Sequence, residues 1–498
     1  MPLFTSASRA VALVLILGTF SVQSSQALDL DWHGQFRAEE NVLFGYTHDV
    51  PVATGANPNN GYSIPNNGDA PATFQNLFFR LDPRVLVNDN ISLHTDIWFG
   101  TPDRGVFGSD ASTTAVGSYL PSNTGNANIT AHTFFGEVAT DFGTIRVGRL
   151  PLNWGLGLVW NSDDKGWDRL PSSGDGIGLV TKFGAFKFMP TIVKYQDYNR
   201  NPTFPAPGGQ TAVGNAGQSD YTVAISYDND DEQVNLGILF MRRIAGLNAN
   251  VLSPFSVGTT GSLNQGSTGY AYNLWDFYAQ KKAGIFTFGA EVPLVSGLVA
   301  SHNYSSVSGA LKVVAKTSEH WKLTVDAGSA AGQDTTTAGD LSSTNLRAFY
   351  FHPDYRPGFL LFNYNYRNIA LQSGSPYDNP ITDARFVAFR ADYTTGKWSH
   401  GFQGMYALAD KVADGTAGNL YFNTLDRQYQ TENASKAQDK GLGVEVDYSL
   451  GYDWDESIHF GLEVGLYVPG GFYDFNNTGA PDSHKTVFGS NLNMMVKF

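Results

Sequence analysis

The sequence contains no cysteine among its 498 residues. This absence excludes disulfide bonds, a thiolate nucleophile and any zinc or iron–sulfur site held by cysteine. A chain without cysteine also fits an exported protein that avoids disulfide chemistry. We therefore expect no cofactor that depends on cysteine ligands.

Charged residues are few, and basic residues are the scarcer kind. Only 16% of the residues are charged, and 32 Lys and Arg stand against 46 Asp and Glu, which gives a net charge of −14. Such an acidic balance argues against nucleic acid as a partner. Glycine and aromatic residues are abundant instead, with 54 Gly and 13% Phe, Trp and Tyr. This composition suits strands and interfacial belts better than helices.

Long apolar runs are missing beyond the N-terminus. Elsewhere Asp, Asn, Gly or Lys interrupts every run well before the roughly 20 residues that a spanning helix needs. The run from Ala10 to Phe20 follows Arg9 and precedes small residues, which is the plan of a secretory signal peptide. An N-terminal membrane anchor is the alternative, but the run is short for it. We expect a signal peptide over 1–27, cut after Ala27, and one mature domain over 28–498.

Motifs of the common enzyme and metal-site classes are also missing. The ten histidines are scattered without HExxH, and neither G-x-S-x-G nor a Walker pattern occurs. The acidic stretches NSDD and NDNDDE lack the spacing and glycine of an EF-hand loop. They are suited at most to loose binding of divalent ions that bridge to lipopolysaccharide. We expect no enzyme, no cofactor and no dedicated metal site.

What the sequence does have is a repeated alternation of apolar and polar residues. From Leu28 to Glu39 the even positions are apolar or glycine and the odd positions polar, over about ten residues, the length of a tilted membrane strand. The same alternation recurs in VNLGILFMR, GIFTFGAEV, WKLTVDAGS, GLGVEVDYSL and SIHFGLEVGLYV. It predicts strands with one apolar and one polar face.

The connections between these strands alternate between short turns and long loops. Short turns are predicted at NDN (88–90), DFG (141–143), KFGA (182–185), DNDD (228–231), KKAG (281–284), TSEH (317–320), TTGK (394–397) and GYDWD (451–455). Between them lie long segments rich in Gly, Asn, Pro and Ser. Loops beyond about 15 residues are uncommon in soluble domains but typical of one side of bacterial outer-membrane barrels.

These patterns together predict an all-β, transmembrane, antiparallel up-and-down β-barrel. Short turns lie on the periplasmic side and long loops on the extracellular side. We count about 20 strands, an even number, with 18 as the alternative. The turn at HPDYRPG and the strand after GRLP are the least marked elements of the count.

The C-terminal residues NLNMMVKF fit the same barrel. Leu492, Met494, Val496 and Phe498 share one face, which we expect to meet lipid while the last strand pairs with the first. The stretch resembles the C-terminal assembly signal of Gram-negative outer-membrane proteins. The resemblance implies recognition by the barrel-assembly machinery.

Several stretches resemble porin-type barrels, including the alginate-export-like group. FGTIRVGRLP (142–151) is similar to the G-x-x-R-x-G-R turn and strand of many porins, and LWDFYAQKKAGIFTFGAEVPLVSG resembles their hairpins. FHPDYRPGFLL is similar to a stretch of related barrels. The resemblance implies the fold and an outer-membrane location, and it implies no substrate. Leu150 stands where porins often have glutamine, so no pore role is transferred to that turn.

If the apolar faces point to lipid, the opposite faces line the interior. A lipid-facing Lys or Arg near the bilayer midplane would cost about 2–4 kcal/mol, so an aqueous or fully paired interior is required. The alternative to a pore lining is that these charges only pair across strands. The predicted pore-lining residues are Arg37, Glu39, Arg80, Asp82, Arg84, Asp96, Glu291, Lys322, Asp326, Arg390, Asp392, Glu445, Asp447 and Glu463.

The loop over 152–176 interleaves tryptophans with charges. Its candidate constriction residues are Trp154, Trp160, Asp163, Asp164, Trp167, Asp168 and Arg169. Such a loop either folds inward, where aromatic platforms beside charges suit sugar rings, or packs in the outer aromatic girdle.

We expect a channel for passive diffusion of small hydrophilic solutes, modestly favouring cations. The expected partners are outer-membrane lipid, lipopolysaccharide, the barrel-assembly machinery and the solutes, with the barrel either alone or in a homotrimer. The alternatives are a substrate-specific oligosaccharide channel, for export or uptake, and a non-conducting structural or adhesin barrel. Bilayer conductance separates these functions.

Overall fold

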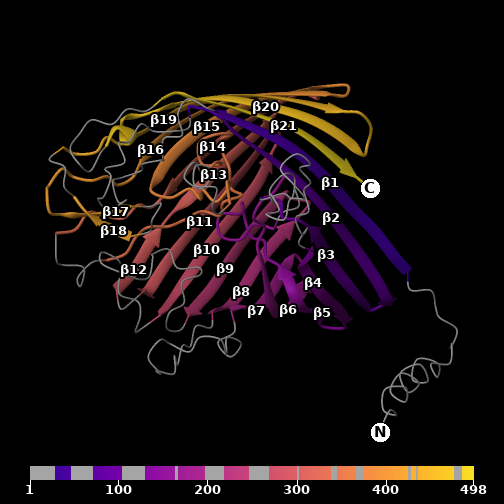
Figure 1. Ribbon diagram of the computed structural model, residues 1–498. Helices are drawn as coiled ribbons and strands as arrows, with labels where there is room; N and C mark the ends of the chain where they lie inside the picture. Colours follow the sequence, from indigo (N-terminus) through magenta and orange to yellow (C-terminus); the bar gives the residue numbers. More distant parts are fainter. Residues whose placement is uncertain are drawn as a thin grey trace, which may run out of the picture.

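A computed structural model shows one large closed β-barrel (Figure 1). The structure describes residues 29–45, 71–103, 129–162, 167–196, 218–245, 269–299, 302–337, 345–365, 375–423, 428–432, 436–475 and 485–498. The signal peptide expected over 1–27 lies outside these residues. No helix in the described part of the chain is both long and apolar enough to cross a membrane.

The wall is a single antiparallel sheet of 19 strands within the described residues. In chain order these strands are β1 (Asp29–Phe44), β2 (Ala72–Asn88), β3 (Ile91–Phe99), β4 (Ile129–Thr140), β5 (Gly143–Pro151), β6 (Ser173–Phe183), β7 (Phe186–Gln196), β8 (Gln218–Asn229), β9 (Val234–Ala245), β10 (Tyr270–Ala283), β11 (Phe286–Val299), β12 (His302–Val307), β13 (Gly309–Lys316), β14 (Trp321–Ala330), β15 (Ala384–Thr395), β16 (Trp398–Ala409), β19 (Gly441–Asp453), β20 (Ile458–Pro469) and β21 (Val487–Lys497). Outside the wall lie a hairpin, β17 (Leu420–Asn423) with β18 (Gln428–Thr431), and a 3-10 helix, η2 (Gly471–Asp474).

The barrel has 18 strand positions, because β12 and β13 occupy one position and both pair with β11. The up-and-down antiparallel barrel is confirmed, with the lower of the two strand numbers considered above. The count of about 20 included a strand after GRLP and a turn at HPDYRPG. Both stretches leave the wall and lie inside it, because they carry apolar side chains such as Leu158 and Phe351 that are 0% and 1% exposed.

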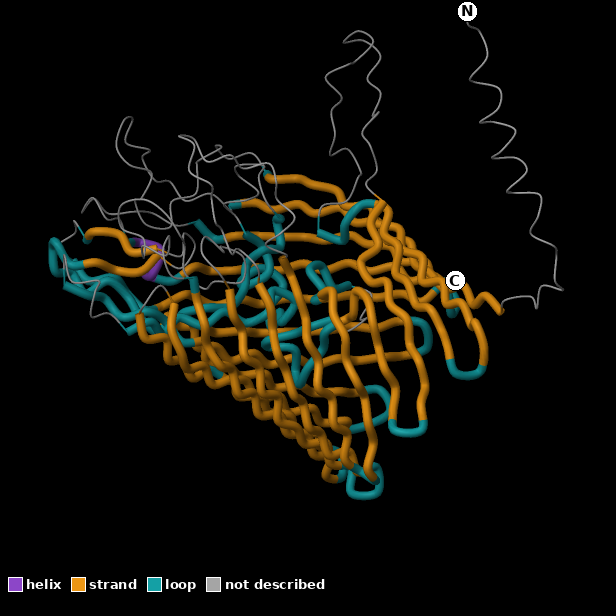
Figure 2. The backbone as a smooth tube through the Cα atoms, turned by 90° about the horizontal axis from the view of Figure 1, so that it is seen from below, coloured by secondary structure: helices purple, strands orange, loops and turns teal. Residues whose placement is uncertain are grey.

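All eight predicted short turns connect neighbouring strands at one rim, drawn in teal in Figure 2. In three of them a glycine has a left-handed backbone, with φ of 59° at Gly184, 60° at Gly284 and 56° at Gly396. Two-residue hairpin turns need such positive φ values, which glycine adopts without steric cost.

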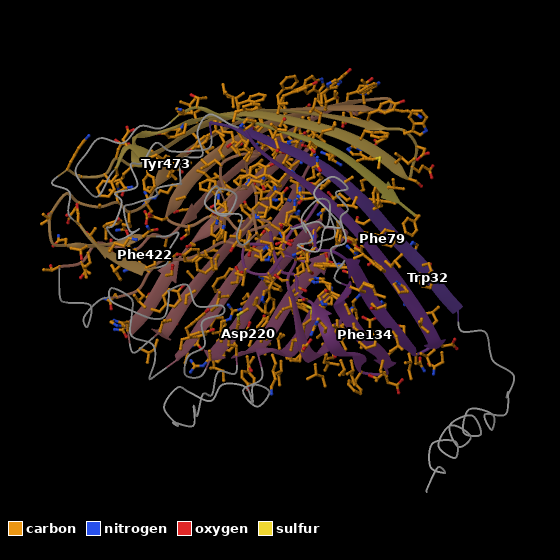
Figure 3. The ribbon with its side chains drawn as sticks, in the orientation of Figure 1. Trp32, Phe79, Phe134, Asp220, Phe422 and Tyr473 are labelled. Atoms are coloured by element: carbon orange, nitrogen blue, oxygen red, sulfur yellow. The ribbon has the colours of Figure 1, made fainter. Side chains whose placement is uncertain are left out.

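Apolar side chains at alternate positions cover the outside of the wall. On β9, Leu236 and Ile238 are 44% and 43% exposed, whereas Leu239, which points to the opposite face, is 1% exposed. Trp32 and Phe134, labelled in Figure 3, are 52% and 58% exposed. An apolar surface on this scale fits hydrocarbon rather than water. The predicted transmembrane barrel of porin type, located in the outer membrane, is confirmed by this architecture.

The last strand closes the barrel against the first. β21 pairs with β1 from Phe44 and Phe488 to Gln35 and Lys497. Gly34 extends this seam, since its N–H donates to the Phe498 carbonyl at 2.9 Å and its carbonyl accepts from the Phe498 N–H at 3.1 Å. Closure leaves no open sheet edge in hydrocarbon, as the C-terminal alternation predicts.

Candidate pore constriction

Two connections between wall strands run inside the barrel, where Figure 2 shows loop segments within the ring of strands. Inner loop A comprises residues 152–162 and 167–172, between β5 and β6. Inner loop B comprises residues 345–365 and 375–383, between β14 and β15. Both belong to one hydrophobic cluster with the inner face of the wall. They narrow the interior that the barrel alone would leave open.

Two carboxylates of the wall hold these loops by their backbone. Glu445 on β19 accepts hydrogen bonds from the N–H groups of Phe359, Leu360 and Leu361 at 2.6–2.7 Å. Glu291 on β11 accepts from the N–H groups of inner loop A at positions 156 and 158. Both glutamates are 0% exposed. A buried carboxylate requires donors, and the exposed backbone of an irregular loop supplies them in succession. These glutamates therefore lie beneath the loops and do not face open space.

The two inner loops are also joined to each other. The Asp354 carboxylate of loop B accepts from the backbone N–H groups of Arg169 and Leu170 at 2.8 and 2.9 Å. The Arg356 guanidinium donates to the Trp167 carbonyl at 2.9 Å. Inner loops A and B therefore form one body rather than two independent segments.

His352 adds a titratable link between the loops. Its Nε2 lies 2.9 Å from Ser172 Oγ, and its Nδ1 accepts from the Asp354 N–H at 3.2 Å. Burial lowers the pKa of His352, which the Asp354 carboxylate opposes and Arg356 favours. The accepting role of Nδ1 requires the neutral ring, with its proton on Nε2.

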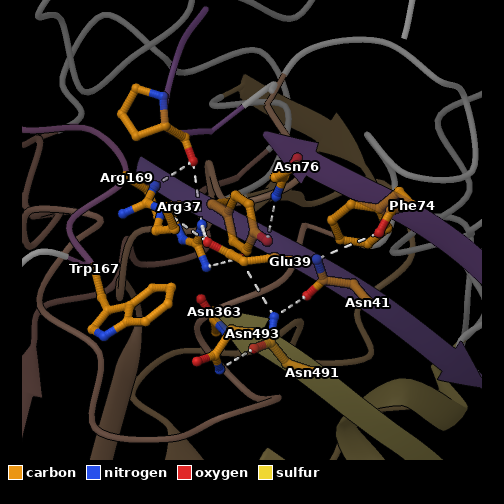
Figure 4. Close-up of polar contacts among 12 residues, drawn as sticks. Arg37, Glu39, Asn41, Phe74, Asn76, Trp167, Arg169, Asn363, Asn491 and Asn493 are labelled. Atoms are coloured by element: carbon orange, nitrogen blue, oxygen red, sulfur yellow. Dashed lines mark hydrogen bonds and ion pairs between the residues drawn. The ribbon is translucent and has the colours of Figure 1, made fainter. Parts of the chain in front are cut away.

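A buried ion triad connects inner loop A to β1 (Figure 4). Arg169 donates to both oxygens of Glu39, at 2.5 Å from Nη1 to Oε1, and Arg37 Nε lies 2.9 Å from Oε1. Arg37, Glu39 and Arg169 are 1%, 5% and 6% exposed. The Arg169 guanidinium also lies over the ring of Tyr377, 4.2 Å from its centroid. Breaking such a buried pair would leave an uncompensated charge, so the triad fixes this loop position.

The other predicted pore-lining residues lie elsewhere on the wall, and Asp96, Asp326 and Asp447 among them are buried. Arg80 pairs with Asp82 at 2.7 Å and Asp96 at 3.1 Å, and Asp392 pairs with Arg390 at 2.6 Å and Lys322 at 3.0 Å. Four residues remain. Asp326 accepts a hydrogen bond from Tyr355 at 2.6 Å, and Asp447 accepts one from Gln403 at 3.0 Å. Arg84 and Glu463 have no hydrogen bond or salt bridge within the described residues. Whether these side chains line a permeation path stays a prediction.

Some residues of the candidate constriction loop are buried, and others lie beside cavities. Trp154 and Trp160 are each 8% exposed within the hydrophobic cluster, and Trp167 and Asp168 lie beside cavities. Asp163 and Asp164 lie outside the described residues. That this loop sets the exclusion limit stays a prediction.

Two cavities remain on either side of the segment from Trp167 to Pro171. The larger cavity, about 520 Å³, lies against β13–β16 and β19–β21 and is lined by residues that include Arg390, Gln403, Ser449, Glu463 and Asn493. The smaller cavity, about 430 Å³, lies against β1–β4 and includes Arg80, Asp96, His94 and His132. No group of three or more His, Asp or Glu in the described ranges is placed to hold a metal ion.

Inner loop B is the element that sequence reasoning missed. It was predicted as strands joined by a turn at HPDYRPG. The run FLLFNY (359–364) was a usable signal, because a connection with so many apolar and aromatic side chains is unfavourable when exposed to water. Five of these six residues are apolar or aromatic, and all of them are buried.

Comparison with known proteins shows a similarity of fold only. No protein-family model and no curated protein matches the chain. Among solved structures, Pseudomonas aeruginosa OpdK with vanillate is 11% identical, with a TM-score of 0.47, 94% of this chain and 98% of that chain covered. Pseudomonas aeruginosa OccK9 (OpdG) is 11% identical and a BenF-like porin from Pseudomonas fluorescens Pf-5 is 10% identical; each has a TM-score of 0.49 and the same coverage. At these values the likeness says nothing about the solute.

Proposed function

We propose that this outer-membrane barrel is a channel through which small hydrophilic solutes diffuse passively. The observation that carries the proposal is that cavities of about 520 and 430 Å³, each lined in part by charged side chains, remain beside the inner loops of an 18-position barrel. Charges inside a barrel wall are tolerated where water or a partner compensates them. The inner loops set the exclusion limit in this proposal, and the paired charges set the local field.

The channel modestly favours cations. This follows from the net charge of −14 and from the smaller cavity, where three carboxylates, Asp82, Asp96 and Asp168, stand against two guanidinium groups. Passage needs no energy source in this proposal, and the chain carries out no chemistry on its solute. We further propose cleavage after Ala27, assembly by the barrel-assembly machinery, and function either as a single barrel or as a homotrimer.

Planar-bilayer recording of the purified protein tests the channel. A stable conductance with a reversal potential of the cation-selective sign in a KCl gradient is expected. Asp96→Asn should shift that reversal potential toward zero, while Asp455→Asn, in an exposed periplasmic turn, should leave it unchanged. A silent bilayer with correctly folded protein would overturn the proposal.

The second candidate is a non-conducting structural barrel. It is favoured by one observation, namely that both inner loops share a continuous hydrophobic cluster with the wall and are held by fully buried carboxylates. This second function would be supported if the folded barrel showed no conductance even after the contacts that hold the inner loops are weakened.

A further inference from the structure

A band of polar side chains crosses five neighbouring strands along the wall of the larger cavity. Register places Arg390 on β15 opposite Gln403 on β16, and Gln403 opposite Asp447 on β19. One step along, Ser449 on β19 lies opposite Glu463 on β20, and Glu463 opposite Asn491 on β21. Guanidinium, amide, hydroxyl and carboxylate groups therefore follow one another along the inner wall.

The inner loops line the other part of the same cavity. Their aromatic side chains there are Trp167, which is half-buried, and Tyr355, Phe359 and Tyr364, which are 5%, 7% and 1% exposed. A solute would therefore meet the Trp167 ring on the loop side and hydrogen-bonding groups on the wall. This combination suits a ring with an apolar face and hydroxyls around its edge.

The cations around this cavity already have partners. Arg390 bonds to Asp392 at 2.6 Å and Ser449 at 3.1 Å, and Arg169 is taken up by Glu39. Lys312 Nζ lies 3.5 Å from Asp326. Arg356 donates to the Trp167 carbonyl at 2.9 Å and to Asn363 Oδ1 at 3.4 Å. Because each of these cations already donates to a group of the protein, a carboxylate would have to displace a partner to gain a bidentate contact.

Glu463 is a polar group of the cavity with spare hydrogen-bonding capacity. It has no hydrogen bond or salt bridge within the described residues, yet Arg390, Arg356 and Arg169 are its main electrostatic neighbours. Those cations repel a positively charged solute from the carboxylate. A neutral hydroxyl can still donate to its oxygens.

We propose that the larger cavity is a binding site for a neutral saccharide, held between the polar band and the Trp167 ring. Its volume of about 520 Å³ lies within the range of small-molecule sites. This inference rests on the proposed channel, to which it adds the class of solute.

Saturation-transfer NMR on the detergent-solubilised protein tests the site without requiring conduction. Glucose and maltose are the neutral probes, and gluconate and glucosamine are charged probes of similar size. We expect saturable binding of the neutral sugars in preference to both charged probes. Tighter binding of gluconate or glucosamine, or no saturable binding of glucose and maltose, would overturn the proposal.

The matched variants are Glu463→Ala and Arg84→Ala. Neither side chain has a hydrogen bond or salt bridge in the described residues, so neither removal breaks a structural contact. Arg84 lines the smaller cavity. We expect Glu463→Ala to raise the Kd of maltose about tenfold and Arg84→Ala to leave it unchanged. Equal affinities of the two variants would contradict the proposal. Conduction without sugar binding overturns only this inference, and sugar binding without conduction overturns only the channel.

Discussion

Glu39 on β1 and Arg169 on inner loop A form a bidentate ion pair in the barrel interior, with both carboxylate oxygens taken by the guanidinium. Glu39 belongs to the strand that closes the sheet, while Arg169 lies 130 residues away in the chain. Arg37 completes the triad from the same strand. This pair fixes a connecting loop to the wall at a point far from its own two strands.

Removing Arg169 should loosen inner loop A. Arg169→Ala leaves Glu39 with only Arg37, and breaking a buried pair costs about 3–5 kcal/mol. We expect a lower unfolding temperature and a larger single-channel conductance. Arg149→Ala serves as the control, because its pair with Asp175 is exposed and such pairs contribute about 0–1 kcal/mol. Equal losses in both variants would show that burial does not set the strength of these pairs.

Removing Glu445 should release inner loop B. Glu445→Ala leaves the buried N–H groups of Leu360 and Leu361 without this acceptor, and the Phe359 N–H with only Asp447 at 3.4 Å, at a cost of about 1–3 kcal/mol for each unsatisfied group. Faster hydrogen exchange over 355–365 is the expected result. Glu445→Gln keeps one acceptor oxygen and should have a smaller effect, and Glu456→Gln, in an exposed turn, should have none. Unchanged exchange in Glu445→Ala would mean that the loop is held by its apolar contacts alone.

Acid should weaken the contact between the two inner loops. The pKa of His352 is lowered in the folded protein by burial, so the docked loops favour the neutral ring. The released loop would take up a proton first, and His352 therefore supports docking above its ordinary pKa of 6.5. That support is lost as the pH falls from 6.5 through the lowered pKa. Hydrogen exchange over 345–365, taken relative to the intrinsic rate at each pH, should rise between pH 7.5 and 5, and His352→Gln should remove most of this dependence. A pH response that persists in the variant would assign it to another group.

The seam should not tolerate a side chain at position 34. A Cβ on Gly34 would lie 2.6 Å from the Arg80 carbonyl oxygen and 2.6 Å from the Phe498 ring. Overpacking of this kind costs about 1–3 kcal/mol, so Gly34→Ala should lower the temperature at which the barrel unfolds on an electrophoresis gel. Gly404→Ala is the matched control, since its nearest neighbour would be 4.0 Å away. If the two variants melt alike, the chain at the seam has room that the structure does not show.

The wall could be predicted from the sequence because lipid imposes a strict rule on it. Alternation of Leu236, Ile238 and their neighbours specifies both the strand and its outward face, and glycines such as Gly184 mark its turns. The inner loops follow no such rule. Leu360 and Phe362 are covered by side chains from distant strands, and no local periodicity encodes that cover.

The same limit applies to individual site residues. Alternation indicates that Glu291, Glu445 and Glu463 share the inward face. Whether such a carboxylate meets water or loop backbone depends on the path of a connection elsewhere in the chain. Glu445 accepts three backbone hydrogen bonds, whereas Glu463 accepts none within the described residues. Sequence spacing does not distinguish them.

The ion triad has a mechanical consequence for the closing seam. Glu39 on β1 also accepts from the Asn491 amide on β21 at 3.4 Å, so Arg169 is linked through Glu39 to both sides of the junction between the first and last strands. Inner loop A thus acts as a strut that braces the joint from within. If β1 and β21 separated, these contacts of inner loop A would have to break. Lateral opening of the barrel at the seam is therefore resisted by a segment that belongs to neither strand.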